Sequence, residues 1–196
     1  MKKILAIGVG SLLFLQAETA FSQRLGGDFG GGGQFWVLYI DPGIDVDRSF
    51  GRDVGGVTAI GGRGFLQTRR VRLGGGGFGG SFSDEGLNED GNRVQGGLSA
   101  AGFTAEYLAV QQDLEVAVGA LLGGGVLSLE ERLSVSGDVE ELRRRRDAIF
   151  VAYPWVRLGY NPAPFVNVGL QLGYFVGTED VGGFAIGLEV GVGLIP

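Results

Sequence analysis

The sequence predicts an all-β fold, an antiparallel meander of about eight strands that forms a closed or nearly closed β-barrel. Three observations lead to this prediction. Apolar residues alternate with glycine or polar residues along several segments, which is the period of a β-strand. Glycine accounts for 40 of 196 residues, yet aromatic and β-branched residues interleave with it, which is typical of a folded sheet. No segment after residue 22 has a convincing helical period.

The first 22 residues have the pattern of a secretory signal peptide. Two lysines precede an apolar run over residues 4–15, and a small-x-small pattern at residues 20–22 predicts cleavage before Gln23. The run is shorter than the ~20 residues that a membrane-spanning helix needs, so we favour a removed signal over a helical anchor. We therefore expect an exported protein with a single domain at residues 23–196.

The mature chain has an unusual set of ionisable residues. It contains 14 arginines and 21 carboxylates, a formal net charge of −7, and no lysine, histidine or cysteine. Without histidine or lysine a serine nucleophile has no usual base, and without histidine or cysteine zinc has no usual ligands. The absence of cysteine excludes a disulfide framework, and the negative charge argues against a nucleic-acid partner. The composition thus predicts a non-enzymatic protein with no cofactor and no metal.

Turn residues divide the mature chain into eight period-two segments. The first, residues 34–40, is aromatic and ends at an Asp-Pro-Gly turn, and the next two, residues 54–66 and 69–82, are rich in glycine. A polar stretch over residues 83–93 follows. The remaining segments are predicted at residues 94–110, 113–129, 139–160, 165–176 and 183–194. A strand with its connection thus takes about 22 residues, which suits an antiparallel meander.

The segments nearest the carboxyl end have the clearest alternation. Within residues 165–176 the even positions carry valine, leucine and tyrosine, and the odd interior positions carry asparagine, glycine and glutamine. Residues 113–122, 148–160 and 184–194 repeat the pattern, and no charged residue falls on any apolar face. Eleven residues at ~3.3 Å each, tilted by ~45°, span roughly 26 Å, which is close to the apolar band of an outer-membrane barrel. Membrane lipid is therefore the predicted partner of this face, while glycine leaves a narrow interior.

The rest of the pattern is less regular. Neither face of residues 69–82 is a good lipid face. The alternation changes parity after Gly123-Gly124-Gly125, which predicts a β-bulge. Aromatic residues near segment ends are expected in the interfacial girdles of a membrane barrel, namely Tyr153, Trp155, Tyr160 and Tyr174.

Glycine motifs recur along the chain in a characteristic order. They are IGGRG at residues 60–64, RLGGGGFGGS at 72–81, GFTAEY at 102–107 and LLGGG at 121–125. In this order they resemble a group of glycine-rich bacterial proteins over roughly residues 34–195, and the resemblance implies no activity. Separately, the alternation in the C-terminal third resembles the eight-stranded outer-membrane barrels of Gram-negative bacteria, which implies the same fold.

Arg157 is a candidate for the interior of the barrel. It belongs to the face opposite the aliphatic residues of its segment, which is the lumen face of a membrane barrel. We expect it to pair with Glu189 or Glu115, which lie on the corresponding faces of their own segments.

The run Arg143, Arg144, Arg145 and Arg146 is open to two interpretations. A two-residue turn at residues 136–139 would place Glu130 opposite Arg145 and Glu131 opposite Arg144, and a water-exposed ladder of ion pairs is favoured. Alternatively the run contacts anionic lipid headgroups or an acidic partner, because arginine binds phosphate bidentately.

Other motifs favour structural roles. A catalytic acid pair is one alternative for the carboxylates of one loop, Asp41, Asp45, Asp47 and Asp53. Calcium binding is a second alternative, for this loop and for the carboxylates within residues 84–90. Neither segment has the ligand spacing of a calcium loop, so solvated loops are favoured. The glycines of residues 74–80 lack the lysine and the helix of a phosphate loop, so tight strand packing is favoured.

Two functions remain open at this point. The favoured one is a non-enzymatic barrel of the outer membrane, structural or surface-interacting, with no wide pore. The alternative is a soluble periplasmic or extracellular barrel or sandwich that binds an apolar ligand or self-associates. The two differ in one observable, the direction in which the aliphatic residues of positions 165–194 point.

Overall fold

A computed structural model describes residues 29–41, 56–82, 86–87, 93–135, 139–178 and 181–194. The predicted signal peptide lies outside the described residues, as do Asp45, Asp47, Asp53 and nearly all of residues 83–92. The described chain folds into β1 (Phe29–Ile40), β2 (Val57–Thr68), β3 (Val71–Phe82), β4 (Gly86–Leu87), β5 (Arg93–Gln111), β6 (Leu114–Val135), β7 (Val139–Ala163), β8 (Val166–Gly177) and β9 (Gly182–Leu194). The described residues include no helix long and apolar enough to cross a membrane.

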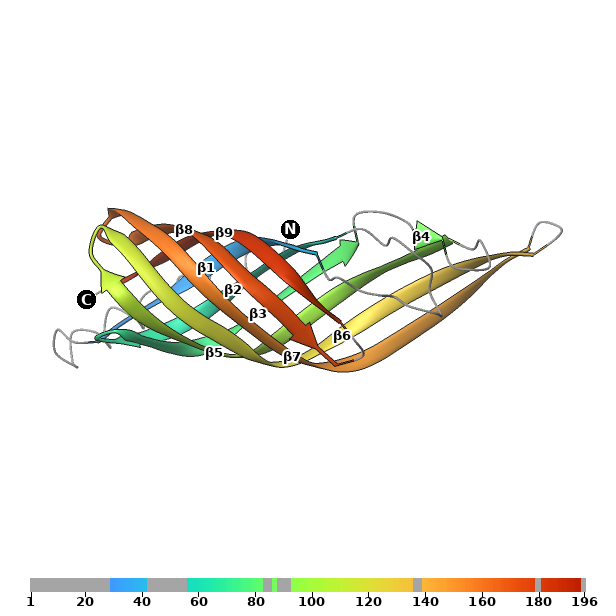
Figure 1. Cartoon of the computed structure of the whole chain (residues 1–196), viewed down its shortest axis with the longest axis horizontal. Coiled ribbons are helices and arrows are strands. Elements are labelled where there is room, and N and C mark those ends of the chain that lie inside the picture. Colours follow the sequence, from blue (N-terminus) through green and yellow to red (C-terminus); the bar gives the residue numbers. More distant parts are fainter. Residues whose placement is uncertain are drawn as a thin grey trace, which may run out of the picture.

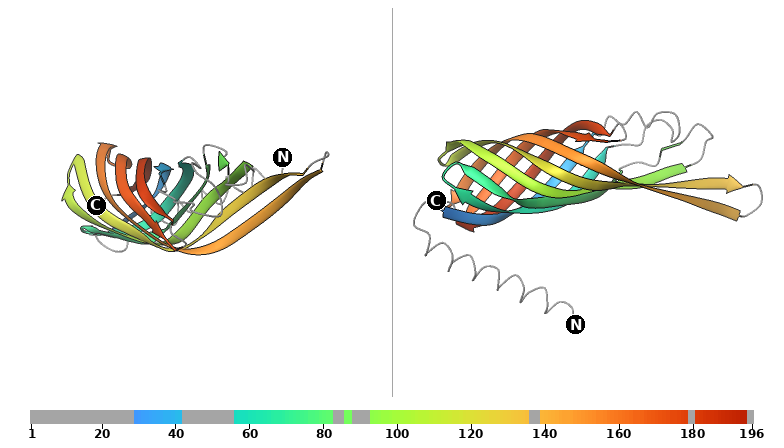
Figure 2. Two further views of the ribbon diagram at one scale, coloured as in Figure 1. Left: turned by 45° about the vertical axis from the view of Figure 1, so that its right-hand side comes forward. Right: turned by 90° about the horizontal axis from the view of Figure 1, so that it is seen from below.

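Eight of these strands form a closed antiparallel barrel (Figures 1 and 2). Each strand pairs with the next along the chain, apart from β4, which is two residues long and pairs only with β5. The first and last strands, β1 and β9, pair from Gly31↔Leu194 to Ile40↔Ala185 and so close the ring. The predicted fold class, an antiparallel meander of about eight strands, is confirmed.

Strand β1 begins earlier than the sequence predicted. The first predicted segment begins at Gln34, after residues 29–33, of which four are glycine. In the structure, Gly31, Gly32 and Gly33 pair with β2 on one side and with β9 on the other. Glycine carries no alternation signal, so the sequence pattern starts only at Gln34 although the ladder starts at Phe29.

Strands β6 and β7 extend beyond the barrel as a long hairpin, seen in yellow and orange in Figure 1. Their pairing continues from Leu114↔Tyr160 to Val135↔Val139. The neighbouring strand β8 leaves β7 at Val151↔Gly177, so residues 139–149 of β7 have a ladder partner on the β6 side alone within the described chain. Residues 139–149 of β7 therefore form an open ladder edge within the described chain.

The predicted bulge at residues 123–125 is wrong. The β6–β7 register runs through these glycines without a shift, and the bulge lies on β5, between Leu108 and Val110. From Glu115 to Leu129 the odd-numbered residues of β6 point inward, and Leu127 and Leu129 are buried like Glu115. The change of parity in the sequence therefore marks a change inside the barrel, from charged side chains at one end to apolar ones at the other.

Two glycines on neighbouring strands test how tightly the barrel is packed. A Cβ added at Gly74 would approach the Cα of Phe65 to 2.8 Å, whereas one added at the outward Gly64 meets nothing within 4 Å. We expect Gly74→Ala to lower the free energy of unfolding by about 1–3 kcal/mol, as overpacking does. Gly64→Ala should leave it unchanged or raise it by about 0.4–1 kcal/mol. Chemical unfolding midpoints of both variants check this, and equal effects would contradict it.

Candidate functional site

Six charged side chains meet inside the barrel. Three are arginines and three are glutamates, and each lies at an inward position of a different strand. All six side chains are buried, with at most 1% of their surface exposed. They are Arg63 (β2), Arg72 (β3), Glu106 (β5), Glu115 (β6), Arg157 (β7) and Glu189 (β9), which we call the ionic cluster.

Glu106 lies at the centre of the ionic cluster because it contacts all three arginines. Its Oε2 accepts a hydrogen bond from Arg63 Nη2 at 2.6 Å, and its Oε1 lies 3.0 Å from Arg72 Nη1 and 3.3 Å from Arg157 Nη2. The indole Nε1 of Trp155 donates a further bond of 3.0 Å to Oε2. Both carboxylate oxygens thus have charged partners, which a buried charge requires.

Arg157 contacts both carboxylates that the sequence analysis assigned to it. Its Nη1 lies 3.0 Å from Glu189 Oε1, its Nη2 donates to Glu115 Oε1, and Nη1 also donates to Asn167 Oδ1 at 2.8 Å. Arg72 completes the set with two parallel bonds to Glu115, each of 2.9 Å. Such a fork-to-fork arrangement fixes both planes and suits arginine better than lysine.

Amide side chains surround the ionic cluster and orient it. Gln34 accepts a hydrogen bond from Arg63 Nε and donates one of 3.1 Å to Glu189. Gln67 accepts from Arg72 Nε at 2.7 Å and donates to the carbonyl of Arg69, in the turn between β2 and β3. With three positive and three negative charges, the ionic cluster is formally neutral. The bond from Gln67 to Arg69 connects it to the end of the barrel where β2 turns into β3.

The other half of the interior is apolar and aromatic. Trp36 and Trp155 pack edge to face with centroids 6.2 Å apart, and Phe78 packs in the same way on Tyr153 and Phe175. The Arg63 guanidinium lies 5.1 Å from the ring centroid of Trp155, which joins the two halves through a cation–π contact. The girdle prediction is therefore wrong for Tyr153 and Trp155, which fill the interior, whereas Tyr160 and Tyr174 point outward.

The outer wall of the barrel is a continuous apolar belt. The alternate side chains of β8 and β9 point outward as aliphatics, including Leu172 and Leu188, while Gln171 and Glu189 point inward. Among the strand residues whose side chains the structure describes, charged groups point outward only at Glu130, Arg144 and Arg146, on the projecting hairpin. Other large outward side chains include Phe35, Val37, Ile60, Leu66, Leu73, Phe103, Leu122, Phe150, Val156, Leu158, Leu170, Ile186, Val190 and Val192.

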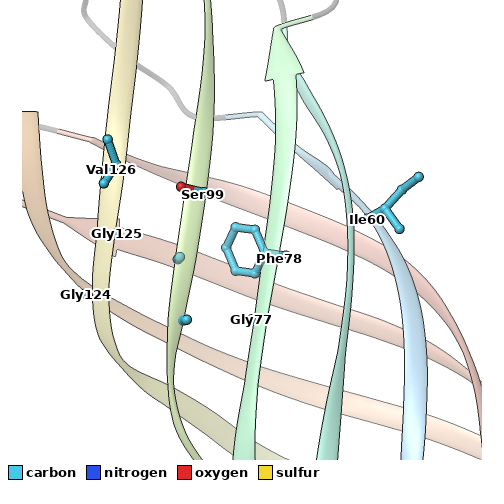
Figure 3. Close-up of a pocket in the computed structure, with 9 residues that line it drawn as sticks. Ile60, Gly77, Phe78, Ser99, Gly124, Gly125 and Val126 are labelled. Carbon is cyan, nitrogen blue, oxygen red and sulfur yellow. The ribbon is translucent and has the colours of Figure 1, made fainter. Parts of the chain in front are cut away.

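The belt includes shallow depressions, among them the following two. The first, of about 750 Å³, crosses β2, β3, β5 and β6, where Gly77, Ala101 and Gly124 leave little bulk between Ile60 and Val126 (Figure 3). The second has a similar volume of about 790 Å³ and lies over β6–β9 and β1, with apolar side chains such as Val156, Leu172 and Phe184 among its walls. Because both depressions are lined mainly by apolar side chains and glycine, they suit contact with hydrocarbon chains.

The arginine run has a different register from the one predicted. Glu130 pairs with Arg144 and Glu131 with Arg143, one residue away from the expected positions. The ladder ends at Val135↔Val139, so three residues separate the last paired positions, where a turn of two residues was expected. Because the length of the loop sets the register of a hairpin, the pairing is shifted by one residue. Arg144 forms an ion pair of 2.9 Å with Glu130. The side chain of Arg143 lies outside the described part.

Half of the ionic cluster was not predicted from the sequence. Arg63, Arg72 and Glu106 were not proposed as partners of Arg157, because the glycine-rich faces of β2 and β3 gave no sign of which parity points inward. The signal that would have found them is their common parity with the bulky aromatics of the same strands, Phe65 for Arg63 and Phe78 for Arg72. Among the described residues, no histidine, cysteine, aspartate or glutamate group is arranged to hold a metal ion.

These features define the class of the chain as a closed eight-stranded barrel with a filled, charge-balanced interior and an apolar outer wall. Neither a protein-family model nor a curated protein matches the sequence. The resemblance to the glycine-rich bacterial group stays a prediction.

Solved structures of similar fold include those of three bacterial proteins. The N-terminal β-barrel domain of Pseudomonas aeruginosa OprF is 18% identical, with a TM-score of 0.45 over 84% of this chain and 99% of that one. Ail of Yersinia pestis, solved with the heparin analogue sucrose octasulfate, is 13% identical, with a TM-score of 0.49 over 85% and 98%. Neisserial surface protein A is 10% identical, with a TM-score of 0.45 over 86% and 97%. The likeness concerns the fold alone.

Proposed function

We propose that this chain is a non-enzymatic β-barrel of the bacterial outer membrane, with a structural or surface-interacting role. The observation that carries the proposal is the outward direction of the aliphatic residues on β8 and β9. Leu188 and Val192 are 64% and 59% exposed, so water or lipid contacts them directly. An exposed apolar surface that surrounds a whole barrel is far larger than the patches of a soluble monomer, and lipid is its natural solvent.

The dimensions of the belt support the same proposal. Strand β9 carries outward apolar residues from Phe184 to Val192, and β7 carries them from Ala148 to Tyr160. Nine to thirteen residues at ~3.3 Å, tilted by ~45°, span about 20–30 Å, which brackets the ~25 Å apolar band of outer-membrane barrels. Between Val151 and Tyr160, β7 pairs with β6 on one side and with β8 on the other, which meets the condition that the bilayer imposes on a sheet.

The filled interior argues against a wide pore. The ionic cluster occupies one end of the lumen and the packed aromatics occupy the other, and both sets of side chains are buried. Eight-stranded barrels have interiors just wide enough for side chains to fill. The protein is thus suited to anchor itself in the membrane and to present the long β6–β7 hairpin beyond it.

Fractionation and electrophoresis test the proposal. We expect the protein to stay with the outer-membrane fraction unless detergent is added, and to migrate faster on a gel without boiling than after boiling, because the closed barrel resists detergent. In planar bilayers it should show no large, stable conductance. The alternative, a soluble barrel that binds an apolar ligand or self-associates, predicts high solubility without detergent, and that result would overturn the proposal.

A further inference from the structure

The outward face of the β6–β7 hairpin changes from apolar to cationic within two residues. Along β7, Phe150 and Ala148 belong to the belt, and Arg146 and Arg144 follow at the next two outward positions. On the paired strand β6, Val126 is followed by Ser128, the partner of Arg146, and by Glu130, the partner of Arg144. The cationic step therefore lies on the same face as the belt and directly continues it.

The height of this step corresponds to the headgroup layer of a membrane. Arg146 lies 14 residues from Tyr160, which marks the other rim of the belt on β7. Fourteen rises of ~3.3 Å, tilted by ~45°, place Arg146 about 33 Å above that rim, beyond a ~25 Å apolar band by about the depth of the headgroups. Lipid phosphates are located at this depth.

The two outward arginines are available for an anion to different degrees. No described carboxylate forms an ion pair with Arg146. Arg144 uses Nε for Glu130, at 2.9 Å, and its side chain is 64% exposed. Arg145 belongs to the opposite face of the strand, where its Nε lies 2.6 Å from Asp147. Among the side chains that the structure describes on the outward face of β6 and β7, Arg144 and Arg146 thus face a single carboxylate, Glu130.

We infer that Arg144 and Arg146 together bind the phosphate group of a membrane lipid whose acyl chains lie on the belt beside Phe150 and Val126. Outward residues two apart on a strand are about 7 Å from each other, so two long guanidinium side chains can reach one phosphate. The Ser128 hydroxyl lies on the same face and is placed to donate a further hydrogen bond. The inference rests on the proposed function, because it requires the belt to be in lipid.

Titration of the folded barrel in neutral detergent tests the inference, with native mass spectrometry as the readout. The probe is dioctanoyl phosphatidate, and the variant is Arg144→Gln/Arg146→Gln. We expect the double variant to bind the probe at least tenfold more weakly, since each arginine near a lipid surface contributes roughly fivefold to the affinity. The matched control, Arg145→Gln, removes one charge from the opposite face of the same strand and should keep the wild-type affinity.

Three further probes identify the source of the phosphate. Dioctanoyl phosphatidylcholine, inorganic phosphate and heparin should each bind weakly and without dependence on the two arginines. Equal affinity of wild type and double variant for phosphatidate would overturn the inference, and so would arginine-dependent binding of heparin or inorganic phosphate in place of the lipid. Failure of the wild type to fold in detergent or vesicles would instead overturn the proposed membrane function.

Discussion

Replacing Glu106 by glutamine is expected to lower the free energy of unfolding by about 3–5 kcal/mol, the usual cost of breaking a buried ion pair by removing one partner. Glu106 contacts Arg63, Arg72 and Arg157. Glutamine keeps the shape of the side chain but leaves three buried arginines against two glutamates. The urea midpoint of the barrel folded in lipid vesicles measures the effect.

Two further variants separate charge balance from packing. Glu130→Gln removes a glutamate of the exposed hairpin, whose ion pair with Arg144 is open to water, and should change the free energy of unfolding by less than about 1 kcal/mol. The double variant Glu106→Gln/Arg63→Met restores the charge balance of the ionic cluster, so we expect it to be more stable than Glu106→Gln alone. If Glu106→Gln and Glu130→Gln have equal effects, the cluster does not stabilise the barrel.

Arginine at position 188 should be the most harmful change on the outer wall. Leu188 lies midway between Phe184 and Val192 on β9, and its partners across the ladders are Leu170 and Val37. At the centre of a bilayer, arginine on the lipid face of a barrel costs about 2–4 kcal/mol. We therefore expect Leu188→Arg to lower the free energy of unfolding in vesicles by this amount, measured from urea titrations of tryptophan fluorescence.

The matched control for this change is Thr68→Arg. Thr68 is also outward and exposed, but it is the last residue of β2, next to the turn at Arg69–Arg70. Near the interface the cost of an arginine falls to about 0–1 kcal/mol. If both variants fold equally well, the outer wall is in water, and the soluble alternative replaces the membrane proposal.

The sequence predicted the C-terminal half of the barrel better than the N-terminal half. Outward leucine and valine alternate with inward glycine and glutamine on β8 and β9, so both faces can be assigned from one strand. On β3 the outward positions after Leu73 are Gly75, Gly77, Gly79 and Ser81, and an apolar face built from glycine has no side chains to reveal it.

The candidate site was predictable in part for the same reason. Arg157, Glu115 and Glu189 lie on strands whose inward parity is evident, so their meeting inside the barrel follows from closure. Which charges lie at the same height depends on the stagger of the strands around the ring, which no single segment contains. Glu106 and its contacts with Arg63 and Arg72 therefore required the whole sheet.

The seam between β1 and β9 has a consequence for how the barrel assembles. Glu189 and Gln34 come from the two strands that meet last in a meander, and they hold Arg157 and Arg63. Before the seam forms, these guanidinium groups have lost part of their hydration without gaining all their partners, so incomplete barrels are electrostatically penalised. Closure of the β1–β9 seam and pairing of the buried charges thus occur in one cooperative step. We therefore expect insertion into the membrane to proceed without long-lived open intermediates.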